Sequence, residues 1–110
     1  MRYSKYGNIT CKCVQGHIHD SRGEAKYCTE LFYQQKAGEI QSYEIQRKYP
    51  LVLDRKSMGY MRVDFEVINK EGKTEIHEYK GMATSIWRLK VKIFKVCYPD
   101  IEYKIIWHRK

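Results

Sequence analysis

Residues 60–80, YMRVDFEVINKEGKTEIHEYK, contain two stretches that are typical of neighbouring β-strands. Both stretches, 60–68 and 74–80, are rich in aromatic and β-branched residues, and the polar segment 69–73 separates them. A short linker that contains glycine favours a β-hairpin, here with residues 70–72 as a three-residue loop. This hairpin predicts a sheet and determines which side chains face one another.

In this register, three charged side chains project from one face of the sheet. Asp64 directly faces Glu78, with Cβ atoms about 5 Å apart, and Lys80 shares their face because side chains alternate along a strand. Arg62 faces Lys80. Two carboxylates this close repel each other unless a cation lies between them. Mg²⁺ or Mn²⁺ suits this position, because such ions accept one or two carboxylates and keep water and phosphate oxygens as further ligands.

A lysine beside such a metal can orient or deprotonate the attacking water, or neutralise charge that develops on a phosphate. The pattern of Asp64, Glu78 and Lys80 therefore predicts a metal-dependent phosphodiesterase. The alternative is an ordinary solvent-facing hairpin, in which the same charges form weak cross-strand ion pairs.

The remaining sequence predicts a single α/β domain over residues 1–110, in which two helices flank a central mixed β-sheet and a β-hairpin precedes them. Ser21 and Glu24 match a helix capping box, and Ala37-Gly38 supplies a stop. The predicted elements are a hairpin at 9–19, a helix from 21–24 to 37–38, strands at 43–53, 60–68 and 74–80, a helix at 85–97 and a strand at 101–107. The strand at 43–53 is broken near Pro50, and 54–59 is a polar turn.

The second helix, 85–97, has an apolar face and a basic face. Its predicted apolar face consists of Ile86, Leu89, Ile93, Phe94 and Cys97. Basic residues that could face DNA are Arg62 on the hairpin and Arg88, Lys90 and Lys92 on this helix. A solvated basic face is the common alternative meaning of such spacing.

The charge balance favours a polyanionic partner. The chain has 110 residues, with 21 Lys and Arg against 13 Asp and Glu, which gives a formal net charge of +8. Such a surplus attracts nucleic acid, although it also keeps a protein in solution. Because the sequence contains no apolar run near 18 residues and no signal-peptide segment at its start, we expect no membrane span and a cytoplasmic location.

Several short motifs together resemble a known family. They are Val63-Asp64-Phe65, Glu78-Tyr79-Lys80-Gly81, Thr84, Leu89-Lys90 and Tyr98-Pro99-Asp100, with His19-Asp20-Ser21, Glu24-Ala25 and Ala37-Gly38-Glu39-Ile40 earlier in the chain. Over nearly the whole chain, the sequence is similar to phage proteins of unknown function in the DUF1064 group. That group is classed with the PD-(D/E)XK, or restriction-endonuclease-like, nucleases.

This resemblance implies a function and assigns roles to residues. Asp64 and Glu78 would bind Mg²⁺, and Lys80 would be the catalytic lysine. Val63 stands where the superfamily usually has proline. Glu24 matches a first-helix glutamate that many members direct toward the metal, whereas the capping box gives it only a backbone hydrogen bond.

The activity implied by the resemblance is a DNA endonuclease in a bacterial or phage-infected cytoplasm, which leaves a 5′-phosphate. A chain this short has little room for a separate sequence-reading domain, so structure-selective or weakly specific cleavage is expected. Two sites in a homodimer would cut two strands. The alternative function is a non-catalytic nucleic-acid-binding module that keeps the nuclease fold.

The N-terminal hairpin offers a second metal site. If Cys13 faces His17 across the loop 14–16, then Cys11 faces His19, and the four side chains form a Cys₂His₂ set suited to a structural zinc ion. Cys28 on the following helix is a further candidate. A two-residue turn at 15–16 would instead put the cysteines and histidines on opposite faces, and buried thiols with polar histidines are the alternative. Disulfides are not expected without a secretory signal.

Overall fold

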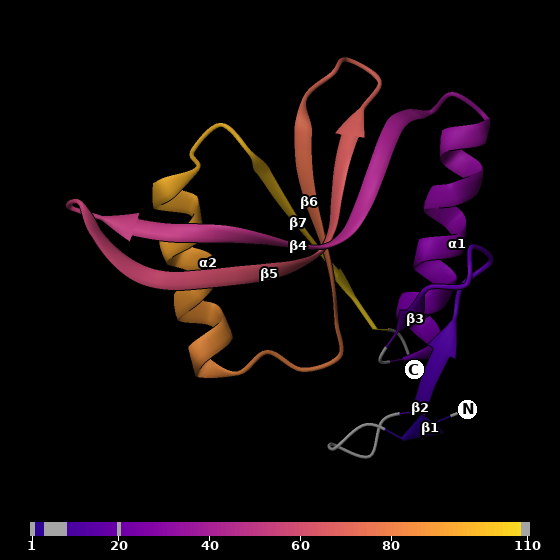
Figure 1. Ribbon diagram of the computed structural model, residues 1–110, viewed down its shortest axis with the longest axis horizontal. Coiled ribbons are helices and arrows are strands. Elements are labelled where there is room, and N and C mark those ends of the chain that lie inside the picture. The colour runs from indigo at the N-terminus through magenta and orange to yellow at the C-terminus, as the bar shows by residue number, and fades with distance from the viewer. Residues whose placement is uncertain (1, 4–8, 20, 109–110) are drawn as a thin grey trace.

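The computed structural model describes residues 2–3, 9–19 and 21–108 and contains two helices and two sheets in that part of the chain (Figure 1). The elements in chain order are β1 (Arg2–Tyr3), β2 (Ile9–Lys12), β3 (Ile18–His19), α1 (Arg22–Lys36), β4 (Ile40–Leu53), β5 (Lys56–Asn69), β6 (Thr74–Lys80), α2 (Ser85–Cys97) and β7 (Glu102–Trp107). The fold is therefore α/β.

The larger sheet is mixed and has the strand order β4-β5-β6-β7. β4, β5 and β6 pair antiparallel, whereas β6 and β7 pair parallel. Parallel neighbours need a crossover connection, and α2 supplies it. The two helices lie on opposite sides of the sheet (Figure 1). This arrangement confirms the predicted mixed sheet with two flanking helices.

Two hydrophobic clusters hold the helices against the sheet. The first joins α1 to the middle of the sheet through Ala25, Cys28, Leu31, Phe65 and Val67, with Cys13 and Ile40 at its edge. The second joins α2 to the other side through Leu51, Met61, Val63, Ile76, Val91 and Phe94. Burial of these apolar side chains is the main favourable term for the fold.

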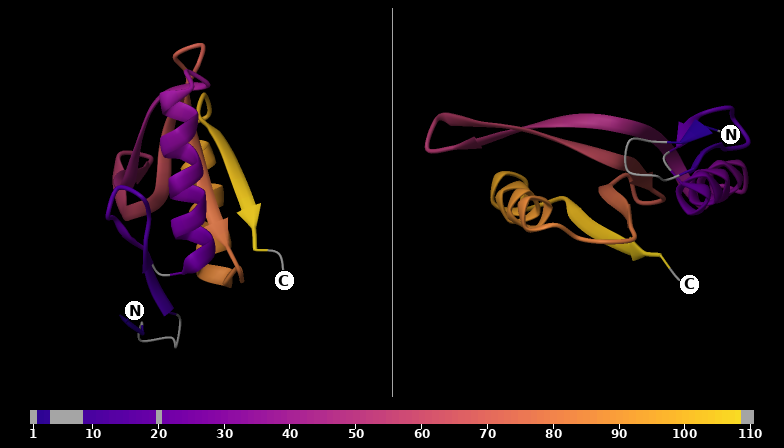
Figure 2. Two further views of the ribbon diagram at one scale, coloured as in Figure 1. Left: turned by 90° about the vertical axis from the view of Figure 1, so that its right-hand side faces the viewer. Right: turned by 90° about the horizontal axis from the view of Figure 1, so that it is seen from below.

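β4 and β5 continue beyond the rest of the sheet. β5 pairs with β6 only from Phe65 to Ile68, while its pairing with β4 extends to the turn between them. We call the projecting part, residues 47–63, the arm; its tip reaches past α2 (Figures 1 and 2). Gln46, which lies opposite Asp64 at the base of the arm, has a φ of 55°, unusual in a strand. The ribbon therefore bends where it leaves the sheet.

The arm ends in a tight turn that the sequence reasoning misplaced. Residues 54–59 were expected to form a polar turn, but β5 begins at Lys56 and the turn comprises only Asp54 and Arg55. Both have positive φ, 49° and 63°, as a type I′ turn requires. Neither residue is glycine, so the usual signal for this turn is absent. Pro50 does not end β4; the pairing only shifts register between Pro50 and Val52.

We expect Arg55→Gly to raise the free energy of unfolding by about 0.5–1 kcal/mol, because glycine occupies the left-handed region without the cost that a side chain adds. Thermal unfolding of the two proteins measures the effect. Lys56→Gly, one position later in β5, is the matched control and should destabilise the arm. A loss of stability in Arg55→Gly would show that the arginine side chain matters more than its backbone strain.

Both helices lie where the sequence predicted them, and the predicted apolar face of α2 is correct at Ile93, Phe94 and Cys97 but wrong at Ile86 and Leu89. Ser21 caps α1 by accepting the Glu24 N–H at 3.1 Å, and α2 spans the predicted residues. In α2, however, Ile86 is 71% exposed and Leu89 58% exposed, while Val91 is buried. The helix turns Trp87, Val91 and Phe94 toward the sheet, since these aromatic and branched side chains fill the space under the arm. In the part of the chain with described structure, neither helix is long and apolar enough to cross a membrane.

Candidate functional site

The hairpin of β5 and β6 has the predicted register. Phe65 pairs with His77 and Ile68 with Thr74, and the Asn69 N–H donates to the Lys73 carbonyl at 2.8 Å across the three-residue loop. Gly72 closes the loop with a φ of 84°. The ladder ends at Phe65, where the carboxylate of Asp64 accepts the backbone N–H of Tyr79 at 2.9 Å. Asp64 thereby remains beside Glu78 after the strands separate.

Glu78 is a buried carboxyl group next to a second carboxyl group. Only 2% of Glu78 is exposed, and the Tyr103 hydroxyl donates to its Oε1 at 2.8 Å. Burial, followed by the hydrogen bond and the negative charge of Asp64, raises the pKa of Glu78 to about 9, against the opposing effects of Tyr103 and Lys80. At neutral pH the pair therefore retains a proton that a divalent cation could replace.

Lys80 and α2 extend this site into an open groove. The Lys80 ammonium lies over the Trp87 ring, 4.9 Å from its centroid. Trp87 in turn lines a groove of about 580 Å³ between the arm and α2. The groove is lined by Met58, Gly59, Tyr60, Met61, Arg62, Thr84, Ile86, Trp87 and Lys90.

Two of the four predicted DNA-contacting residues therefore lie at one groove. Arg62 does not face Lys80, as the extended hairpin register suggested. It pairs with Lys48 of β4, because β5 has already left β6 at this point, and it reaches the groove from the arm. Lys90 reaches the groove from α2. Arg88 and Lys92 are exposed on the same helix but do not line the groove.

The N-terminal strands contribute a second cluster. β2 pairs antiparallel with β3, with Cys11 opposite His19, and the Cys13 N–H donates to the His17 carbonyl at 2.9 Å. One ligand atom from each of Cys13, His17, His19 and Cys28 lies within 4.8 Å of the others, so this Cys₂His₂ cluster could bind a structural metal such as Zn²⁺. The expected set contained Cys11 in place of Cys28. The side chain of Cys11 lies outside the described residues.

Glu24, predicted either to point toward the metal site beside Asp64 or only to cap the helix, contacts this second cluster. It is buried, and its Oε2 lies 2.7 Å from His19 Nδ1. The charges that shift the pKa of Glu78 are those of Asp64 and Lys80, whereas Glu24 helps to raise the pKa of the Cys28 thiol to about 12, after the larger effects of burial and Cys13. The structure therefore brings Asp64, Glu78 and Lys80 together without showing Glu24 among them.

A sequence comparison places the chain in a family. The family model described as "Protein of unknown function (DUF1064)" matches residues 3–110. The chain belongs to the DUF1064 family. No curated protein and no solved structure matches it.

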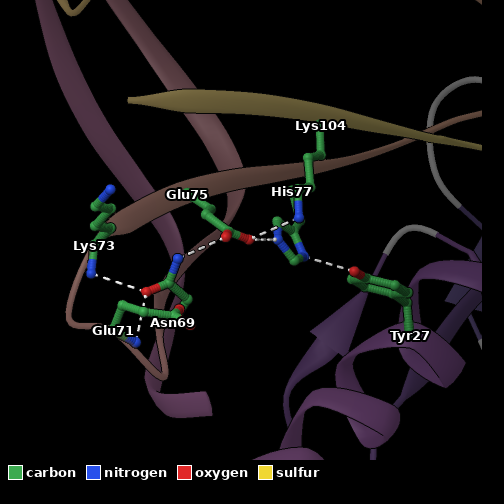
Figure 3. Close-up of polar contacts among 7 residues, drawn as sticks. All are labelled: Tyr27, Asn69, Glu71, Lys73, Glu75, His77 and Lys104. Atoms are coloured by element: carbon green, nitrogen blue, oxygen red, sulfur yellow. Dashed lines mark hydrogen bonds and ion pairs between the residues drawn. The ribbon is translucent and has the colours of Figure 1, made fainter. Parts of the chain in front are cut away.

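The DUF1064 fold also contains a buried polar network that sequence reasoning missed (Figure 3). Burial chiefly lowers the pKa of His77, which favours the neutral ring; in that form Nε2 donates to Glu75 at 2.8 Å and Nδ1 accepts the Tyr27 hydroxyl at 2.6 Å. Despite burial, hydrogen bonds from His77, Asn69 and Lys104 lower the pKa of Glu75 to about 2. The network connects α1, β6, β7 and the hairpin loop. The only sign of it in the sequence is that polar residues, Glu75 and His77, stand on either side of the apolar Ile76 in β6.

Proposed function

We propose that this DUF1064 protein is a metal-dependent DNA endonuclease of the PD-(D/E)XK type, structure-selective or weakly sequence-specific. The observation that carries the proposal is the buried Glu78 beside Asp64, with Lys80 two residues farther along the same strand. Burying one carboxyl group beside a second one that is partly buried is unfavourable without a compensating charge. A site that accepts this cost is a strong candidate for a functional one.

The donor atoms fit a hard divalent cation. Asp64 and Glu78 offer carboxylate oxygens, which Mg²⁺ or Mn²⁺ prefers, and leave positions for water and a phosphate. When bound, the ion would polarise the phosphate and favour ionisation of the water. The Tyr79 N–H and the Tyr103 hydroxyl each fix one carboxylate by a hydrogen bond, so the two groups are oriented before a ligand arrives.

Lys80 would act on the scissile phosphate. Its ammonium can orient the attacking water and neutralise charge as the water oxygen bonds to phosphorus and the bond to the 3′ oxygen breaks, leaving a 5′-phosphate. The Trp87 ring beneath the ammonium limits its positions.

The groove supplies a surface for the nucleic acid. Arg62 and Lys90 line it beside the aromatic rings of Tyr60 and Trp87, and the whole chain carries a net charge of +8. Cations contact phosphates, and the exposed Tyr60 ring can accept an unstacked base, which favours DNA with unpaired or branched segments. Binding should weaken steeply with salt, because phosphate contacts release counterions.

The decisive experiment uses Asp64→Asn, whose amide oxygen can still accept the Tyr79 N–H. We expect the natural protein to cut labelled duplex, single-stranded or branched DNA in Mg²⁺ or Mn²⁺ but not in EDTA, and Asp64→Asn to lose about 10³-fold or more of that rate. Glu71→Gln makes the same kind of change in the exposed hairpin loop and should leave the rate unchanged. Equal cleavage by Asp64→Asn would remove this carboxylate from the site.

A second candidate function is a non-catalytic DNA-binding module. The basic groove favours it independently of the carboxylates, because Arg62 and Lys90 contact phosphates whether or not a bond is broken. Salt-sensitive DNA binding by mobility shift, with intact DNA under every metal condition, would establish this function in place of the nuclease.

A further inference from the structure

We propose that Cys13, His17, His19 and Cys28 bind one Zn²⁺ ion that fastens the N-terminal strands to α1. The four side chains come from two separate parts of the fold, since Cys28 lies on α1 while the others lie on or beside β2 and β3. This proposal is independent of the nuclease activity, because the cluster contains none of the groups beside Asp64.

The spacing of the donor atoms fits a tetrahedral zinc site. Zn–S bonds of about 2.3 Å and Zn–N bonds of about 2.0 Å place neighbouring ligand atoms roughly 3.3–3.8 Å apart. His17 Nδ1 and Cys28 Sγ are 3.5 Å apart, and all four ligand atoms lie within 4.8 Å of one another. Small side-chain rotations would therefore complete the site without moving a helix or strand.

His19 gives independent evidence for a ligand. Only 2% of this residue is exposed, and its Nδ1 is bonded to Glu24 at 2.7 Å, yet its buried Nε2 has no hydrogen-bond partner among the residues that the structure describes. A buried nitrogen without a partner is costly. A histidine that ligates zinc through one nitrogen and donates its other N–H to a carboxylate is the usual arrangement. Glu24 is thus a positioning residue for His19.

The chemistry of the cluster selects zinc over magnesium and indicates a structural role. Thiolates and imidazoles are the ligands that zinc prefers, whereas magnesium prefers oxygen. Three of the four residues are buried, and His17 is partly buried. Four protein ligands leave no position for a substrate, so the ion would stabilise the fold rather than take part in catalysis.

Two other states of the cluster would leave features unexplained. A disulfide between Cys13 and Cys28 would leave His19 Nε2 buried without a partner, and a set of plain thiols would offer it only the weak hydrogen bond of the Cys13 sulfur. Zinc satisfies that nitrogen and both sulfur atoms together. Cys28 also changes the structural role of the ion. With Cys11 as the fourth ligand the ion would connect only β2 and β3, whereas with Cys28 it connects these strands to α1.

The test measures zinc bound to the full-length protein, purified without added metal, and cobalt absorption after exchange. We expect about one zinc ion per chain, and visible bands of tetrahedral cobalt–thiolate coordination. Cys28→Ser should lose the zinc, whereas Cys11→Ser and Cys97→Ser, which make the same change outside the four ligands, should retain it. Glu24→Gln should bind zinc roughly 10- to 100-fold more weakly, because His19 loses its carboxylate partner.

Alkylation and thermal unfolding of the natural protein test the proposal even if Cys28→Ser fails to fold. Zinc should protect Cys13 and Cys28 from alkylation, and a chelator should expose them and lower the melting temperature, with both effects reversed by added Zn²⁺. A chain that purifies without zinc and shows no response to Zn²⁺ would overturn the proposal. Zinc lost from Cys11→Ser but retained by Cys28→Ser, or a Cys13–Cys28 disulfide found by mass spectrometry, would also overturn it.

Discussion

Glu78→Gln should abolish metal-dependent DNA cleavage and at the same time make the metal-free protein more stable at about pH 8. The loss of activity should be about 10³-fold or more, because an amide is a poor ligand for a hard cation beside Asp64. The gain in stability arises because the amide occupies nearly the same volume without an ionisable group. A functional carboxylate commonly lowers the stability of the fold that holds it.

The pH dependence of stability distinguishes this effect from a general change in packing. Burial and Asp64 raise the pKa of Glu78 from its ordinary value of 4.5 to about 9. Between these values the folded chain keeps a proton that the unfolded chain releases, so the stability of the metal-free protein falls as pH rises. The fall is absent below the unfolded pKa and complete above the folded pKa.

Thermal unfolding in EDTA at about pH 5, 7 and 9 measures the prediction. The melting temperature of Glu78→Gln minus that of the natural protein should increase with pH, whereas Glu71→Gln in the exposed loop should show a constant difference. If the two variants behave alike, Glu78 does not hold a proton in the fold, and the argument for a strained carboxylate pair fails.

Phe94→Ala should lower the free energy of unfolding by about 3–5 kcal/mol. Phe94 is fully buried in α2, and its ring centroid lies 5.2 Å from that of Tyr49, 4.9 Å from that of Tyr98 and 5.3 Å from that of Tyr103. Truncation leaves a cavity that these rings cannot fill. For a chain of this length, the melting temperature should fall by more than about 12 °C.

Leu89→Ala is the matched control for this prediction, since it removes a large apolar side chain from the same helix. Leu89 is 58% exposed, so its loss should cost less than about 1 kcal/mol. Denaturant unfolding compares the two variants. Equal losses of stability would mean that α2 buries Leu89 as well as Phe94.

Local sequence patterns predicted the elements well where one signal sufficed. The β5–β6 register followed from Gly72 and the strand pattern, and the start of α1 followed from Ser21. The turn at the tip of the arm was missed because Asp54 and Arg55 adopt positive φ without the expected glycine. The predicted apolar face of α2 was correct at Phe94 but wrong at Ile86 and Leu89, because exposed apolar residues mimic a buried face.

The candidate sites were predictable only in part, because local patterns do not determine how distant segments pack together. Asp64 and Glu78 are neighbours across one hairpin, so strand geometry was enough to bring them together. Cys28 and Glu24 depend on how α1 packs against the N-terminal strands, and spacing along the chain does not determine that packing. The position of Arg62 likewise depends on the point at which β5 stops pairing with β6, which is Phe65, and the sequence does not show where that pairing ends.

The bend at Gln46 divides the sheet into two branches, β6 and the arm, and Asp64 lies where the two branches separate. Glu78 lies on β6 and Asp64 lies at the base of the arm. A change in the angle between β6 and the arm must therefore change the separation of the two carboxylates. If the two carboxylates bind a cation as proposed, a force that bends the arm would alter the affinity of the site, and by reciprocity a bound cation would change how easily the arm bends.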